Sequence, residues 1–173
     1  IAQIIDGELV VSPRPAIIHS QASSVLGSDL LHPYFRGRGG PGGWWILDEP
    51  ELHLGDDVLV PDLAGWRRAR LPDPRGLAFI ELAPDWICEV LSPSTAGIDR
   101  VRKLHIYGRE HVAHVWLVDP AARTLEVLRG IEQGWLLSAT HGGDERVRAE
   151  PFTEVELELS AWWGELPAKD APP

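Results

Sequence analysis

Several residue types are scarce or absent in this chain of 173 residues. It contains no methionine, one cysteine and two lysines, and its apolar runs are short. A membrane-spanning helix needs about 20 consecutive apolar residues, so the sequence predicts none. The single cysteine, Cys88, excludes an intrachain disulfide and is consistent with a reducing compartment. We therefore expect a cytoplasmic protein that does not enter a membrane.

The balance of charge is strongly negative. The chain carries a formal net charge of -10 at pH 7, and 44% of its residues are hydrophobic. Such a chain can bury one ordinary core, so we predict a single domain over residues 1–166 and a mobile tail over residues 167–173. The negative charge counts against a tight, sequence-independent nucleic-acid binder, because such proteins use lysine and arginine to bind phosphates. Two arginine-rich segments, residues 67–75 and 100–103, are either a local phosphate track or solvated surface.

Hydrophobic patterning predicts a chain that mixes strands and helices. Asp6-Gly7, between two apolar runs, indicates a tight hairpin near the N-terminus. Helices are predicted over residues 16–31 and from about residue 95 to residue 109. The strands are predicted at residues 44–47, 51–54, 58–63, 86–91, 114–119, 124–131, 135–139 and 155–159. The order strand, helix, strand from residue 86 to residue 119 predicts a parallel crossover within an otherwise antiparallel sheet.

An acidic residue interrupts the most apolar of these strands. Residues 86–91 are typical of a central strand buried on both faces, yet Glu89 lies among them. A carboxylate does not enter an apolar interior without a partner or a metal ion, so Glu89 indicates either a functional site or an internal salt bridge to an arginine. Asp62 is a second acid on a predicted strand. Two carboxylates are a usual protein contribution to a magnesium site.

Lys103 is the sole lysine outside the Pro/Ala-rich C-terminal residues. It lies four residues after Asp99 and four before Tyr107, which puts the three side chains on one face of the predicted helix. A lysine beside a metal site can orient the attacking water or stabilise charge that develops on a phosphate. Spacing alone favours a simpler interpretation, a surface ion pair between Asp99 and Lys103.

Several short motifs occur in a fixed order along the chain. They are Pro61-Asp62, Glu89-Val90-Leu91-Ser92-Pro93-Ser94-Thr95, then Asp99, Lys103 and Tyr107, and finally Trp116-Leu117-Val118-Asp119-Pro120. Together they closely resemble the Uma family of predicted endonucleases, which belongs to the restriction-endonuclease-like PD-(D/E)XK superfamily. The resemblance covers nearly the whole chain. It implies an α/β (α+β) fold with a mixed β-sheet core flanked by helices, an N-terminal β-hairpin, and a metal site at one edge of the sheet.

The resemblance also assigns residues to this site. Asp62 matches the acid of the Pro-Asp motif and Glu89 the acid of the second strand, and both are expected to hold Mg²⁺ or Mn²⁺. The superfamily lysine stands two residues after the second acid, where this chain has Leu91. In the Uma pattern the lysine lies on the following helix, and Lys103 matches it. Glu51, upstream of the Pro-Asp motif, is a candidate for a further acid at the metal.

Three other residues are candidates for binding roles beside the site. Ser92 and Thr95 are expected to shape the turn between the strand and the helix, and His19 on the first predicted helix is a further candidate.

The sequence leaves two functional hypotheses open. The first is a metal-dependent endonuclease that hydrolyses phosphodiester bonds of DNA. The alternative is a catalytically inactive module of the same fold that serves binding or assembly, as a homodimer joined through tryptophan-rich surfaces, because a fold does not determine a function. A serine or cysteine hydrolase has little support, since no Gly-x-Ser-x-Gly motif occurs and Cys88 lies in an apolar run.

Overall fold

The computed structural model describes residues 1–164. Its strands are β1 (Ala2–Ile5), β2 (Glu8–Val11), β3 (Trp44–Asp48), β4 (Leu52–Leu54), β5 (Asp57–Leu59), β6 (Leu63–Arg67), β7 (Trp86–Val90), β8 (His114–Asp119), β9 (Thr124–Ile131), β10 (Gly134–Gly142), β11 (Arg146–Val147) and β12 (Leu157–Glu158). Its helices are α1 (Ile17–Leu30), α2 (Leu104–Arg109) and α3 (Leu159–Trp162), with π-helical segments η1 (Leu31–Phe35) and η2 (Ile98–Lys103).

Two sheets carry most of these strands. The central sheet has the order β10-β9-β8-β7-β6-β3, and a smaller N-terminal sheet has the order β2-β1-β5-β4. Within the central sheet β7 and β8 are parallel, and the other neighbours pair antiparallel. The chain passes from β7 to β8 through η2 and α2, as predicted. The mixed α+β fold and the N-terminal hairpin of β1 and β2 are likewise confirmed.

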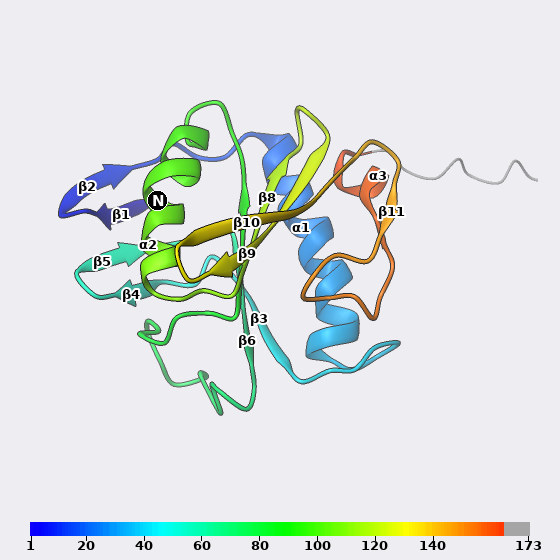
Figure 1. The fold of residues 1–173 in the computed structure, drawn as a ribbon, viewed down its shortest axis with the longest axis horizontal. Coiled ribbons are helices and arrows are strands. Elements are labelled where there is room, and N and C mark those ends of the chain that lie inside the picture. Colours follow the sequence, from blue (N-terminus) through cyan, green and yellow to red (C-terminus); the bar gives the residue numbers. More distant parts are fainter. Residues whose placement is uncertain (165–173) are drawn as a thin grey trace, which may run out of the picture.

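The central sheet is covered on both faces. Figure 1 shows α1 and α2 on opposite sides of it, and each side has its own hydrophobic cluster. Along β7, Trp86 and Cys88 pack in the cluster under α1, whereas Ile87 packs in the cluster with Ile106 of α2. Successive strand residues point to opposite faces, so Glu89 shares the face of Ile87 and points toward the helix formed by η2 and α2.

The strand predicted over residues 58–63 is two strands in the structure. β5 ends at Leu59 and β6 begins at Leu63, and the two belong to different sheets. Pro61 has no N–H to donate to a ladder, which suits a link and not a strand interior. The hydrophobic pattern predicted one strand because the residues of both strands are mainly apolar. The consequence is that Asp62 lies where the chain crosses from the N-terminal sheet to the central sheet.

The C-terminal part also differs from the prediction. The strand predicted over residues 155–159 is reduced to β12, which pairs with the short β11, because the chain turns into α3 at Leu159. The Trp162 indole of α3 donates a hydrogen bond of 2.9 Å to Asp29 of α1. The predicted tail over residues 167–173 lies outside the described residues. Within residues 1–164, no helix combines the length and apolar character needed to cross a membrane.

One phenylalanine joins the C-terminal segment to the rest of the core. The ring of Phe152 is fully buried, and its centroid lies 4.6 Å from Tyr34, 4.9 Å from Trp44, 5.0 Å from Trp86 and 5.6 Å from Trp116. Aromatic pairs at these separations stabilise a core beyond their buried area. This cluster therefore holds the C-terminal segment against η1, β3, β7 and β8.

Replacing Phe152 by alanine should strongly destabilise the fold. A large buried aromatic replaced by alanine leaves a cavity, and we expect the free energy of unfolding to fall by about 3–5 kcal/mol in urea denaturation. Phe79, which is 40% exposed, provides the matched control, and Phe79→Ala should cost far less. Equal losses in the two variants would show that the cluster has no special role.

Candidate active site

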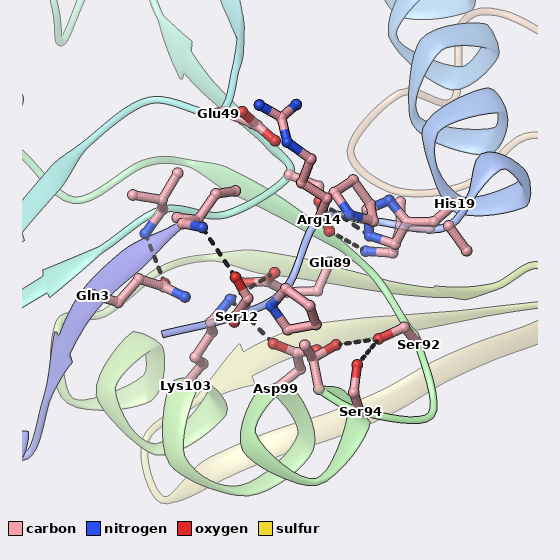
Figure 2. A pocket seen from close by; sticks show the side chains of 18 of the residues that line it. Gln3, Ser12, Arg14, His19, Glu49, Glu89, Ser92, Ser94, Asp99 and Lys103 are labelled. Carbon is pink, nitrogen blue, oxygen red and sulfur yellow. Dashed lines mark hydrogen bonds and ion pairs between the residues drawn. The ribbon is translucent and has the colours of Figure 1, made fainter. Parts of the chain in front are cut away.

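A pocket of about 270 Å³ lies where the N-terminal sheet meets the ends of β6 and β7 and the helix formed by η2 and α2. Four carboxyl groups line it, from Glu49, Asp62, Glu89 and Asp99, together with the ammonium group of Lys103. Figure 2 shows Glu49 and Glu89 on the side of the sheets and Asp99 and Lys103 on the helix. The structure thus brings Asp62, Glu89 and Lys103 into a single pocket.

Asp62 is held at the end of β7. Because Leu63 of β6 pairs with Cys88 of β7, Asp62 comes beside Glu89. Its Oδ2 accepts a hydrogen bond of 2.6 Å from the backbone N–H of Val90, and its Oδ1 lies 3.2 Å from His19 Nε2. These contacts fix the orientation of the Asp62 carboxylate.

Glu89 is almost completely buried, with 2% of its surface exposed. Its Oε2 lies 3.0 Å from Lys103 Nζ, and its Oε1 accepts a hydrogen bond of 2.5 Å from the Tyr107 hydroxyl. Burial raises the pKa of Glu89, the negative charges of Asp99 and Asp62 raise it further, and Lys103 and Tyr107 lower it. The result is a pKa of about 8, well above that of an ordinary glutamate.

Lys103 lies between two acids. Its Nζ is 3.0 Å from Glu89 Oε2 and 3.0 Å from Asp99 Oδ1. Burial lowers the pKa of Lys103, but the two carboxylates offset this effect and leave the pKa above its usual value. The expected ion pair between Asp99 and Lys103 exists, yet its side chains are only 4–5% exposed, so the surface interpretation is wrong.

Tyr107 completes this network, although the sequence indicated only that it shares a helix face with Asp99 and Lys103. Burial raises the pKa of Tyr107 well above its usual value, and the nearby Glu89 raises it further. The hydroxyl therefore keeps its proton and donates a hydrogen bond to Glu89. The helix that supplies these residues is π-helical over η2, a conformation that is often found at functional sites.

His19, in the first turns of α1, lies in the pocket as a partner of Asp62. Burial lowers its pKa, but the hydrogen bond and charge of Asp62 raise it more, so the pKa of His19 is raised overall. Its Nδ1 is buried and, among the described residues, has no hydrogen-bond partner. The geometry makes His19 a positioning partner for Asp62.

Ser92 and Thr95 also line the pocket and form the turn that precedes the helix. The Ser92 hydroxyl lies 3.0 Å from both the Ser94 and the Thr95 hydroxyls. The backbone oxygen of Ser92 accepts hydrogen bonds from the N–H groups of Thr95 and Ala96. Figure 2 shows this turn at the edge of the pocket.

Glu51 lies apart from these residues, unlike the expectation that it joins the metal site. Its carboxylate is 2.8 Å from His53 Nε2 and borders a different hollow. Glu49 lines the pocket in its place, at a bend where its φ is +43° and its backbone N–H donates to the carbonyl of Asp62. The family resemblance singled out Glu51 as the acid upstream of the Pro-Asp motif, and no sequence signal indicated Glu49.

The pocket's donor set suits a hard divalent cation. In the described part of the chain, no cluster of three or more His, Cys, Asp or Glu side chains is arranged to hold a metal ion. Asp62 and Glu89 nevertheless offer two carboxylates, and magnesium usually takes one or two from a protein, with water and substrate phosphate as its other ligands. Each carboxylate oxygen has one partner and retains a second lone pair. The raised pKa of Glu89 reflects its burial first and the negative charges of Asp99 and Asp62 second, and a bound cation would oppose both effects.

The fold is that of a restriction-endonuclease-like protein, and the pocket holds two acids at neighbouring strand ends with a lysine opposite them. The model of the Uma2 family, described as "Putative restriction endonuclease", matches residues 2–161. The chain therefore belongs to the Uma2 family, and this membership supports a nuclease activity.

A solved structure has the same fold. It is the crystal structure of "a putative nuclease belonging to DUF820" from Anabaena variabilis ATCC 29413, which matches with a TM-score of 0.76 and 22% sequence identity over 94% of this chain and 89% of that chain. At this identity the likeness shows the fold alone. The search of curated proteins found no match.

The raised pKa of Glu89 predicts a pH dependence of stability. The pKa is about 8 in the folded protein, against 4.5 for an ordinary glutamate, so the folded state holds this proton more tightly than the unfolded chain. Its stabilising effect is complete below the unfolded pKa and is lost as pH rises through the folded pKa. We expect the free energy of unfolding of the metal-free protein, measured with urea in EDTA, to lose this contribution between about pH 5 and pH 8.

Two variants isolate the contribution of Glu89. Glu89→Gln cannot ionise and should lack this part of the pH dependence, whereas Glu51→Gln, at the exposed acid outside the pocket, should retain it. Superimposable pH profiles for the wild type and Glu89→Gln would contradict the assignment.

Proposed function

We propose that this protein is a metal-dependent nuclease that hydrolyses phosphodiester bonds in DNA. One observation carries the proposal: Asp62 and Glu89 lie at adjacent strand ends in the same pocket as Lys103. Membership in a family described as restriction endonucleases supports the nuclease activity. The proposal further specifies that the substrate is DNA and that the metal ion is Mg²⁺ or Mn²⁺.

Each residue has a distinct role in this proposal. Asp62 and Glu89 would hold the metal ion, which when bound polarises a phosphate oxygen and lowers the pKa of a bound water. His19 orients Asp62, and Tyr107 orients Glu89, through the hydrogen bonds described above. Both are positioning residues, since neither needs to contact the substrate.

Lys103 would both orient Glu89 and supply positive charge. A lysine ammonium has three N–H donors, and two of them are directed to Glu89 and Asp99. One donor remains for a water molecule or a phosphate oxygen in the pocket. This arrangement agrees with a lysine that steadies the attacking water in a hydrolytic reaction.

Metal binding should depend on both carboxylates and should release a proton. We expect calorimetric titration of Mn²⁺ to show binding by the wild type and at least about tenfold weaker binding by Asp62→Asn and Glu89→Gln, because each variant loses a charged ligand. Near pH 7, binding to the wild type should release the Glu89 proton, which titration in two buffers of different ionisation enthalpy detects.

Glu51→Gln is the matched control for this titration, because it removes an acid outside the pocket and should bind Mn²⁺ like the wild type. Repeating the titration with a short DNA duplex present covers a metal ion that needs substrate phosphate as a ligand. If Glu89→Gln binds as the wild type does in both conditions, Glu89 is not a ligand.

Cleavage itself is tested on supercoiled plasmid DNA with Mn²⁺. The wild type should nick the plasmid, and Asp62→Asn should reduce the rate by at least about a hundredfold, because an amide removes the ligand charge with little change of volume. Glu51→Gln should cleave at the wild-type rate. The extent of nicking is read from agarose gels.

A nuclease-fold module without catalytic activity is the second candidate. The paired state of Lys103 and the net charge of -10 favour it, because both leave little free positive charge for a nucleic acid. A folded wild type that does not nick DNA in the presence of Mn²⁺ would support this candidate. The homodimer and the cytoplasmic location stay predictions.

A further inference from the structure

The pocket holds more negative than positive charge. Glu49, Asp62, Glu89 and Asp99 all line it, and the Lys103 ammonium lies between two of them. A nucleic-acid phosphate is itself negative, so it must enter beside these carboxylates. A divalent cation offsets part of this repulsion, but the phosphate oxygens that face away from the cation still need donors.

The arginines next to this lysine cannot supply them. Arg100 forms an ion pair of 2.7 Å with Glu126, and Arg102 forms ion pairs of 3.0 Å with Asp6 and 2.9 Å with Glu8. The segment over residues 100–103 is therefore not a free phosphate track, because acidic partners already neutralise its cations.

Arg14 is a further cationic side chain at the pocket. Its side chain is exposed and lines the pocket, and within residues 1–164 it makes neither a hydrogen bond nor an ion pair. Figure 2 shows its guanidinium group pointing toward Glu49. The charge of Arg14 is thus available to a ligand at the mouth of the pocket.

The backbone around Arg14 is constrained. Residues 12–16 lead from β2 to α1 and line the pocket over this whole length. Pro13 fixes its own φ, and Pro15 restricts Arg14 to extended conformations. Two prolines therefore limit the freedom of the segment, so the exposed arginine is presented at the pocket at a lower entropic cost than in a flexible loop.

We infer that Arg14 binds the phosphate group of the substrate at the mouth of this pocket. The inference rests on the proposed nuclease function. A guanidinium group offers parallel N–H donors whose spacing matches two phosphate oxygens, which a lysine ammonium cannot reproduce. Lys103 would then act next to Glu89 within the pocket, and Arg14 would contact the substrate from outside.

The test compares Arg14→Ala and Arg14→Lys with the control Arg75→Ala. The Arg75 side chain is 78% exposed and forms an ion pair with Asp73. Binding of a short DNA duplex is measured by fluorescence anisotropy with Ca²⁺, and nicking of plasmid with Mn²⁺. Loss of a bidentate ionic contact should weaken binding by Arg14→Ala by about tenfold to a hundredfold, with a similar fall in kcat/KM. Arg14→Lys should fall between this variant and the wild type, and Arg75→Ala should stay within about twofold of the wild type.

Two further readouts separate a phosphate contact from a structural role. Mn²⁺ binding by Arg14→Ala should equal that of the wild type, because Arg14 is not a metal ligand. Methylguanidine at concentrations that do not denature the protein should restore part of the nicking activity of Arg14→Ala and leave Asp62→Asn inactive.

The outcomes distinguish this inference from the proposed function. A wild type that nicks DNA together with an equally active Arg14→Ala overturns the role of Arg14 alone. Equal losses in Arg14→Ala and Arg75→Ala overturn it as well, because they indicate a general effect of charge. A wild type that neither binds nor nicks DNA refutes the proposed function, and the inference on Arg14 is refuted with it.

Discussion

The buried contact between Glu89, Lys103 and Tyr107 is the interaction on which the rest of the site depends. A carboxylate inside an apolar strand is tolerated only with partners, and both of these partners come from the helix that covers that face of the sheet. Removing one partner leaves a buried polar group without compensation, which costs about 1–3 kcal/mol and more for a charged group. The same contact therefore holds the helix against β7 and fixes Glu89 and Lys103 where they line the pocket. Stability and chemistry are coupled here, since Asp99 and Asp62 add negative charge that raises the pKa of Glu89.

The position of the two acids follows from the topology of the sheets. Glu89 reaches the pocket because it lies two residues after Ile87 and so points to the same face of β7. A shift of the strand by one residue would point Glu89 to the other face, under α1. Asp62 reaches it by another route, from the link where the chain leaves the N-terminal sheet and joins the central sheet beside β7. The site therefore forms only when both sheets are in place, although neither sheet contains all of it.

Some of this arrangement could be predicted from the sequence. The apolar run of β7, its acid, and the helix with Asp99 and Lys103 on one face are local patterns, and they gave the correct strand, crossover and mixed sheet. Features that depend on distant contacts were not predictable in this way. The chain breaks between β5 and β6 because the two strands pair with different sheets, and Glu49 lies at the pocket because of a bend at positive φ. Glu51 fits the alternation of an exposed strand, which says nothing about the direction of the bend before it.

The position of the lysine has a consequence for the charge of the pocket. In the superfamily pattern that the sequence resembles, the lysine stands two residues after the second acid, on the same face of the strand. Here that residue is Leu91, which packs in the cluster on the face that Glu89 shares. An ammonium that comes from the helix reaches Glu89 from the opposite side, and there it also meets Asp99, four residues earlier on the same helix. One cation is then shared by two buried acids, so less positive charge is left for a phosphate. Arg14, exposed at the mouth of the pocket, can supply the positive charge that is missing. The inferred role of Arg14 therefore follows from the location of Lys103.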